Sequence, residues 1–264
     1  MLAERAGFRA LYLSGAGVAN ASFGLPDLGL TTLTDVCEDV RRITGATRLP
    51  VLVDADTGWG PAPMIARAIR DLERAGAAGC HLEDQAREKR CGHRPGKQLV
   101  SAEEMSDRVR AAVNGRTDSA FLIVARTDAL AAEGVTATLQ RAQCYVDAGA
   151  DAIFLEAAAT LDDYRRFTAA LTVPILANVT EFGVTPLFTV DELRDAGVRM
   201  ALYPLTAFRA MNAAARRVYQ ALRAKGTQKN LLASLETRAQ LYEVLHYLDY
   251  ERQFDELGAG KEPS

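Results

Sequence analysis

The sequence has few cysteines, only three histidines, one tryptophan and no long apolar run. Its four cysteines, Cys37, Cys80, Cys91 and Cys144, include no Cys-x-x-Cys pair, so free thiols in a reducing compartment are expected. No stretch approaches the roughly 20 apolar residues that a membrane span requires. The N-terminal stretch MLAERAGFRALYL lacks the basic start and apolar core of a signal peptide. We therefore expect a cytoplasmic protein that does not bind membranes.

Strong charge of either sign is also missing. The formal net charge is −3, so there is no basic excess to attract nucleic acid. Apolar residues make up 48% and charged residues 25% of the 264 residues, as in an average soluble globular protein. The length fits one large domain or two modest ones. Given this net charge, binding to nucleic acid is therefore not expected.

Short apolar runs alternate with longer amphipathic stretches along the chain. The runs are rich in Val, Ile, Leu and Ala and lack polar alternation, which is typical of strands buried on both faces of a parallel sheet. The stretches between them, such as Met64–Ala75, Ala102–Val113 and Val135–Ala148, have helical spacing and end in glycine turn signals. The seven predicted strands are Ala10–Leu13, Val51–Val53, Gly79–Leu82, Phe121–Ala125, Ala152–Leu155, Pro174–Ala177 and Met200–Tyr203.

Repeated βα units in a chain of this length indicate either a TIM barrel or a doubly wound open sheet. We favour an α/β fold of the (β/α)8 TIM type that lacks its first strand, because seven strands are visible and a closed barrel needs eight. We expect one barrel domain over residues 1–264, with a helical C-terminal part over 207–264. Within that part, Leu231–Tyr250 has an apolar stripe that predicts a long helix with a partner surface in an oligomer.

Polar side chains stand at the ends of six successive predicted strands. The carboxyl ends of the strands of a parallel barrel meet at one rim, where catalytic groups lie. A purely structural barrel has no reason to gather carboxylates there, because like charges repel at close range. The residues are Ser14 with Gly15, Asp54 with Asp56, Glu83 with Asp84, Arg126 with Asp128, Glu156, and Asn178 with Thr180.

Two of these acids predict a metal site. Asp54 and Asp56 follow one strand, and Gly58 with Gly60 loosen the backbone so that both carboxylates can converge on one ion. Carboxylate oxygens and water suit Mg²⁺ or Mn²⁺. Glu83, on the next strand, can join them directly or through water. Any single Asp here has a simpler interpretation as a helix cap or turn residue, but three acids on adjacent strands favour the metal.

The cationic candidates fit a substrate with several carboxylates. Arg126 and Glu156 stand on neighbouring strands and form either a structural ion pair or part of a binding site. Arginine holds carboxylates through two parallel hydrogen bonds, which favours a binding role for Arg126. Arg209 and Arg238 are further candidates, although each can equally be a surface charge on a helix.

The segment KRCGHRP after the Glu83 strand is the most distinctive in the chain. Its glycines and proline are typical of a mobile loop, and loops at this rim commonly act as lids. Four cationic or titratable side chains flank Cys91, which lowers the pKa of a thiol and makes it reactive. We therefore predict a chemical role for Cys91, with His93 either tuning its ionisation or simply bonding to the loop backbone.

At this point the sequence resembles the isocitrate lyase and phosphoenolpyruvate mutase superfamily, and within it the methylisocitrate lyase family. The resemblance rests on YLSGAGVANASFGLPDLG, LVDADTGWG, HLEDQAREKRCGHRPGK, VARTDALAAEG, ANVTEFGVTPLF and LYPLTAFRAMNAAA, and spans Ala10 to about Tyr247. It implies a barrel whose last helix is exchanged between the subunits of a homotetramer. It also implies Mg²⁺ or Mn²⁺, a di- or tricarboxylate substrate, and cleavage of 2-methylisocitrate to pyruvate and succinate.

The resemblance also assigns residues by position. It implies that Asp54 and Asp56 bind the metal with support from Glu83. The residues that it implies for substrate binding are Ser14, Gly15, Ala16, Cys91, Gly92, Arg126, Glu156, Asn178, Val179, Thr180, Arg209 and Arg238. Two departures stand out: the family's first strand has no counterpart, and the substrate loop reads SGAG where SGGG is expected. Ala16 therefore adds a methyl group at a place of close backbone approach.

The implied reaction is a metal-assisted retro-aldol-type cleavage. The catalytic candidates are Cys91, His93, Glu83 and Arg126. A base removes the hydroxyl proton, and Glu83, Glu156 or a water held by the metal can serve. Cys91 then donates a proton to the succinate carbanion. Isocitrate lyase, another 2-alkylmalate lyase, an oxaloacetate hydrolase and a phosphonate mutase remain alternatives within the superfamily, and a non-catalytic barrel subunit remains one outside it.

Overall fold

A computed structural model describes residues 1–86 and 96–259 of the chain. The chain divides into two compact units. The barrel unit comprises Arg9–Thr206, and the helical unit comprises Met1–Phe8 with the chain from Ala207 onward. Among the described residues, none of the helices is long and apolar enough to cross a membrane.

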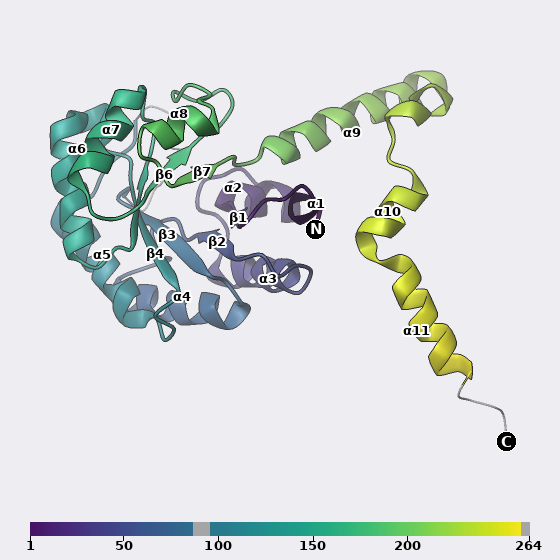
Figure 1. Cartoon of the computed structure of the whole chain (residues 1–264), viewed down its shortest axis with the longest axis horizontal. Helices are drawn as coiled ribbons and strands as arrows, with labels where there is room; N and C mark the ends of the chain where they lie inside the picture. The colour runs from purple at the N-terminus through teal and green to yellow at the C-terminus, as the bar shows by residue number, and fades with distance from the viewer. Residues whose placement is uncertain (87–95, 260–264) are drawn as a thin grey trace. The chain divides into compact units, whose positions relative to one another are not determined.

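The barrel unit is built on seven parallel strands in sequential order, each hydrogen-bonded to the next (Figure 1). The prediction of a TIM-type α/β barrel with seven visible strands is confirmed. Within the described part of the chain, β1 and β7 are the edges of the sheet, so the barrel is nearly closed rather than closed. The strands are β1 (Leu11–Leu13), β2 (Val51–Asp54), β3 (Gly79–Glu83), β4 (Leu122–Thr127), β5 (Ala152–Leu155), β6 (Ile175–Asn178) and β7 (Met200–Leu202).

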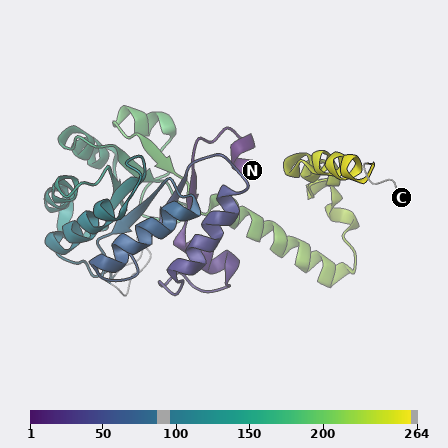
Figure 2. The same ribbon diagram turned by 90° about the horizontal axis from the view of Figure 1, so that it is seen from below.

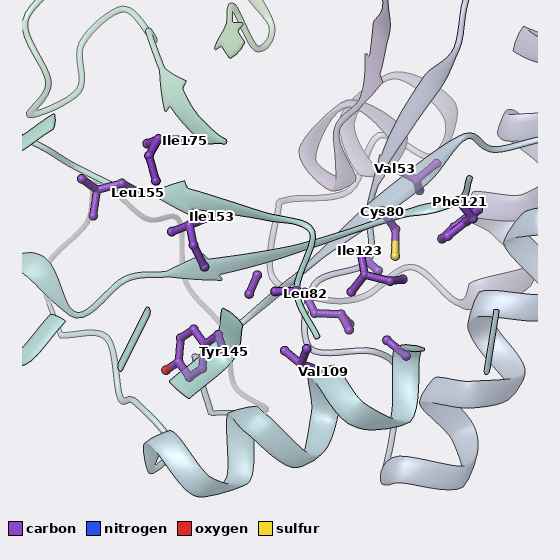
Figure 3. Packing of buried hydrophobic residues seen from close by; sticks show 14 of the residues in the cluster. Val53, Cys80, Leu82, Val109, Phe121, Ile123, Tyr145, Ile153, Leu155 and Ile175 are labelled. Atoms are coloured by element: carbon purple, nitrogen blue, oxygen red, sulfur yellow. The ribbon is translucent and has the colours of Figure 1, made fainter. Parts of the chain in front are cut away.

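Strand alternation divides the buried side chains into two sets. One set, including Val53, Cys80 and Ile123, packs between the strands and the surrounding helices and forms the main hydrophobic core (Figure 3). The other set, including Val124 and Phe154, fills the inside of the barrel. Both faces of the strands are therefore buried, which explains why the strand sequences are continuously apolar.

Helices cover the outside of the strands, and α3, α4 and α5 pack side by side in that layer (Figures 1 and 2). Thr32, Thr160 and Thr189 form capping boxes that fix where α3, α7 and α8 begin. The long helix α6 is interrupted at Gly134, whose φ of 75° is not helical. The helices are α3 (Leu33–Thr44), α4 (Ala62–Ala75), α5 (Ala102–Gly115), α6 (Leu130–Asp147), α7 (Leu161–Ala170) and α8 (Val190–Asp195).

The close approach of α4 and α5 depends on Gly115. A Cβ atom at this position would lie 2.6 Å from both the Cα and the carbonyl oxygen of Ala66. Because these are backbone atoms, the helices would have to move apart. We expect Gly115→Ala to lower the free energy of unfolding by about 2–3 kcal/mol, measured by urea denaturation. The neighbouring exposed residue offers a control, since Asn114→Ala should change it by less than about 0.5 kcal/mol. Equal stability of the two variants would contradict this packing.

The helical unit corrects one prediction. Leu231–Tyr250 is not one long helix but parts of η2 (Lys229–Ser234), α10 (Arg238–Leu245) and α11 (Tyr247–Ala259). A capping box between Thr237 and Gln240 starts α10 as a new helix, and His246, with a φ of 54°, ends it. The apolar spacing was real, but local capping chemistry divides the segment.

The remaining elements of this unit are α1 (Leu2–Arg5) and α9 (Thr206–Lys225). An ion pair of 2.6 Å joins Arg5 on α1 to Glu243 on α10. None of the residues of α9 is buried, although Met211 and Tyr219 are large and apolar. The helices of this unit thus expose apolar side chains that a partner surface can cover.

Candidate active site

Four of the polar residues predicted at the rim lie within the last two residues of a strand, and the others follow the strand ends. The four are Asp54, Glu83, Arg126 and Asn178. Strand pairing aligns Asp54 with His81 and Glu83 with Arg126. Residues two apart on a strand share a face, so His81 and Glu83 of β3 point the same way. The register therefore gathers charged side chains from three adjacent strands on the inner face of the barrel.

Three of these residues can hold a cation. Asp54, His81 and Glu83 are buried, and each offers a ligand atom within 4.8 Å of those of the other two. Glu83 Oε1 is buried without a hydrogen-bond partner in the described part of the chain, as expected for an oxygen that a cation would coordinate. Carboxylate oxygens suit Mg²⁺ or Mn²⁺, and an imidazole nitrogen is compatible with Mn²⁺. The donors present therefore fit a divalent metal.

The second predicted metal ligand, Asp56, is positioned by the backbone. Its φ of 47° lies in the left-handed region, and its N–H donates a 3.1 Å hydrogen bond to Asp54 Oδ1. Gly15 lies against both acids, because a Cβ there would be 3.2 Å from Asp54 Oδ2 and 3.4 Å from Asp56 Oδ1. The Gly15 N–H also donates to Asp54 Oδ2 at 3.0 Å. Gly15 thus leaves room for the two carboxylates and holds one of them.

Two residues of the site were missed by the sequence analysis. Tyr12 on β1 donates to Asp54 Oδ2 at 3.3 Å, and its hydroxyl lies 2.9 Å from His81 Nε2. His81 Nε2 is itself 3.3 Å from Asp54 Oδ1. Burial, followed by the negative charge of Asp54, raises the pKa of Tyr12 well above its usual value, so its hydroxyl stays protonated. The sequence did carry a signal for His81, which is a polar residue two positions before Glu83 in an otherwise apolar strand.

Arg126 is a buried cation among three carboxylates. Its nearest atoms lie 2.9 Å from Asp128, 3.4 Å from Glu83 and 3.8 Å from Glu156. Burial alone would lower the pKa of Arg126, but the three carboxylates raise it well above its usual value. The guanidinium also lies over the Phe154 ring, 5.0 Å from its centroid. Arg126 is therefore charged, held in place and turned toward the inside of the barrel.

Burial raises the pKa of Glu83 well above its usual value, and the charge of Arg126 only partly offsets this shift. A carboxylate in such a setting accepts a proton more readily than an exposed one. The chemistry favoured by this arrangement is proton transfer next to a divalent cation and a fixed guanidinium.

The site continues across β5 and β6. Glu156 follows β5 and is buried, and the Asn178 amide donates to its Oε2 at 3.1 Å and to its Oε1 at 3.4 Å. Val179 and Thr180 come directly after Asn178 and are also buried. The structure thus connects Asp54 to Asn178 through Glu83, Arg126 and Glu156 along consecutive strands. The roles of Glu156, Asn178, Val179 and Thr180 toward a substrate stay predictions.

The remaining candidates lie on other elements of the chain or outside the described residues. Ser14 precedes the short helix α2 (Gly15–Gly17), which contains Ala16 and continues into the π-helical turn η1 (Val18–Ser22). Cys91, Gly92 and His93 lie outside the described residues. Arg209 is on α9 and Arg238 begins α10, both in the helical unit. Their assignments to the substrate or to catalysis remain predictions.

Comparison with known proteins gives consistent matches. A family model described as phosphoenolpyruvate phosphomutase matches residues 1–223. A 2-methylisocitrate lyase of Salmonella typhimurium is 59% identical over 262 residues, covering 99% of this chain and 89% of that protein. A solved 2,3-dimethylmalate lyase, described as a PEP mutase/isocitrate lyase superfamily member, is 36% identical with a TM-score of 0.89, covering 97% of this chain and 86% of that one.

A further solved structure bears on the cation. It is a phosphonopyruvate hydrolase in complex with oxalate and Mg²⁺, 28% identical to this chain with a TM-score of 0.82. The match covers 98% of this chain and 88% of that one. The three proteins are thus matched over 86–89% of their own lengths.

Proposed function

This chain belongs to the phosphoenolpyruvate phosphomutase family of the PEP mutase/isocitrate lyase superfamily, and we propose that it cleaves 2-methylisocitrate to pyruvate and succinate. The observation that carries the proposal is 59% identity to a 2-methylisocitrate lyase over 99% of this chain. The buried acids beside Arg126 support the proposal, because the reaction needs three groups in one place. These are a metal site, a proton acceptor and a positively charged side chain that binds a substrate carboxylate.

Asp54 and Asp56, with Glu83 and His81 beside them, would hold the divalent metal, which we propose to be Mg²⁺ or Mn²⁺. When bound, the metal supplies Lewis-acid stabilisation for the negative charge that develops on the substrate hydroxyl oxygen. Within the chain, His81 and Tyr12 fix one carboxylate by contacts of 3.3 Å to Asp54. The backbone N–H of Gly15 donates to the same carboxylate, at Oδ2.

Arg126 would bind a substrate carboxylate, and Asn178 with Thr180 would orient another. Glu83 or Glu156 would accept the hydroxyl proton. The electrons of the O–H bond then form the ketone of pyruvate as the carbon–carbon bond breaks. The bonding pair leaves with the succinate carbon, and we propose that the Cys91 thiol donates the proton that completes succinate.

The substrate assignment has a direct test. 2-Methylisocitrate, isocitrate and 2,3-dimethylmalate are compared in one steady-state assay, and 2-methylisocitrate should have the highest kcat/KM. The margin over isocitrate should be at least about tenfold, since one methyl group is worth roughly 1–3 kcal/mol in a pocket. A higher kcat/KM for another substrate would move the activity to that lyase. No turnover of any of them with Mg²⁺ or Mn²⁺ would favour a non-catalytic subunit.

Cys91→Ser tests the proposed proton donor. We expect kcat to fall about 100-fold while the protein still responds to Mg²⁺, because a hydroxyl is a much weaker acid than a thiol. Rates are measured with 2-methylisocitrate, and Mg²⁺ binding is followed by thermal unfolding. Cys144→Ser, at an exposed cysteine of α6, is the matched control and should keep the rate of the unchanged chain. Near-normal turnover of Cys91→Ser would remove Cys91 from this role.

The oligomer is also a proposal. The exposed apolar side chains of α9, α10 and α11 favour a second copy as their cover, and we propose the homotetramer implied by the family. A cytoplasmic location likewise stays a prediction.

A further inference from the structure

Arg126 is oriented by Asp128, which follows β4 directly. Arg126 Nε donates to Asp128 Oδ2 at 2.9 Å, and Nη2 donates to Oδ1 at 3.1 Å. Two parallel bonds fix the plane of a guanidinium as well as its position. Asp128 is almost completely buried, so this contact is not weakened by solvent. The direction in which Arg126 presents its charge therefore depends on where Asp128 lies.

Asp128 is held in turn from two sides. The Lys97 ammonium lies 2.9 Å from Asp128 Oδ1, and only 10% of the Lys97 side chain is exposed. The backbone N–H of Asp128 donates to Asp84 Oδ1 at 2.8 Å. Asp84 is fixed by the hydroxyls of Thr127, at 2.7 Å, and Tyr145, at 2.9 Å. Burial alone would raise the pKa of Asp128, but Arg126 and Lys97 lower it to about 2, so Asp128 stays negatively charged.

The charge of Asp128 has a cost for the binding of an anion. A carboxylate approaching Arg126 also meets the negative charge behind it, and in a buried site this repulsion is poorly screened. Lys97 shares Asp128 Oδ1 with Arg126 and so compensates that charge while leaving the two-point contact in place. Lys97 takes no part in the proposed chemistry, yet its side chain is nearly buried and forms an ion pair with Asp128 beside the site.

We propose that Lys97 is a positioning residue that acts through Asp128 to keep Arg126 oriented and available for a substrate carboxylate. The inference rests on the proposed function, because it requires an anionic substrate at Arg126. Its effect falls on the affinity for the carboxylate rather than on the bond-breaking step.

The test compares Lys97→Met, which keeps the apolar stem, with Lys97→Arg, which restores the charge. Lys97→Met should raise the KM for 2-methylisocitrate about tenfold and leave kcat within about threefold. The Kd of succinate, titrated by calorimetry in the presence of Mg²⁺, should rise by a similar factor. Lys97→Arg should return both constants to within about threefold of the unchanged chain. Lys225→Met, at an exposed lysine of α9, is the matched control and should change neither.

A double-mutant cycle tests the route through Asp128. In an Asp128→Asn background, Lys97→Met should change KM by less than about twofold, because its partner charge is gone. The same factor in both backgrounds would overturn the inference. An unchanged KM in Lys97→Met would also overturn it. A lower melting temperature and a lower kcat, with KM and the succinate Kd unaltered, would overturn it as well, because a merely structural residue gives that pattern.

The succinate titration separates this inference from the proposed function. If the unchanged chain does not turn over 2-methylisocitrate but binds succinate, the proposed function fails and the Kd values still decide the role of Lys97. Equal Kd values in the unchanged chain and Lys97→Met would overturn the inference. Absence of succinate binding to the unchanged chain would overturn it as well, since Arg126 would then not hold a carboxylate.

Discussion

Arg126→Lys is expected to lower kcat/KM for 2-methylisocitrate by about 10³-fold. Lysine keeps the positive charge but cannot make the two parallel bonds that Arg126 makes to Asp128. It also cannot offer a planar donor pair to the substrate. Loss of a buried, charge-assisted contact typically costs about 2–5 kcal/mol, and each 1.36 kcal/mol is tenfold in rate. The measurement is a steady-state assay with Mg²⁺ present.

The charge-conserving change avoids removing the buried cation that Asp128, Glu83 and Glu156 share, since loss of that cation would be strongly destabilising. Arg110→Lys is the matched control, since the ion pair of Arg110 with Asp107 is exposed on α5. It should stay within about twofold of the unchanged chain, as expected for a surface pair. A kcat/KM of Arg126→Lys equal to that of Arg110→Lys would exclude Arg126 from substrate binding.

Asp56→Asn should produce the other large loss. The amide keeps the size of the side chain but removes the charge that a divalent cation requires. We expect kcat to fall by about 10³-fold or more, because Lewis-acid stabilisation is worth several kcal/mol. The readout that does not depend on turnover is the melting temperature, which Mg²⁺ should raise in the unchanged chain but not in Asp56→Asn.

Asp107→Asn, at an exposed aspartate of α5, is the control and should keep both the rate and the Mg²⁺ response. Chelator treatment of the unchanged chain completes the experiment and should abolish turnover until Mg²⁺ or Mn²⁺ is returned. Full activity after chelation, or an unaltered Mg²⁺ response in Asp56→Asn, would show that these acids do not form the metal site.

The strand-end residues show how far the sequence could lead. Asp54, Glu83, Arg126 and Asn178 were found because they are polar residues at the ends of apolar runs, and parallel strands bring such ends together. His81 was missed because it lies inside the apolar run Gly79–Leu82 rather than at its end, although it contacts Asp54 at 3.3 Å. Tyr12 was missed because a tyrosine is as common in a buried strand as in an active site.

The C-terminal segment shows the limit of periodicity. Apolar residues at helical spacing predicted one helix over Leu231–Tyr250, but the spacing does not report a break that keeps the helical phase. The side chains of Thr237 and Gln240 cap a new helix, and His246 ends it in the left-handed conformation. Capping involves only a few local hydrogen bonds, so a hydrophobic pattern does not reveal it.

By itself the sequence determined the βα order, the seven apolar strands and the acids and cations at one rim, because each follows from local periodicity or from position along a strand. Only the tertiary structure decided which of these side chains touch. The joining of Lys97 to Asp128, and of Asp128 to Arg126, depends on strand register and on distances of about 3 Å between segments up to 31 residues apart. Register and packing arise from the whole barrel at once, and no single stretch of the sequence contains them.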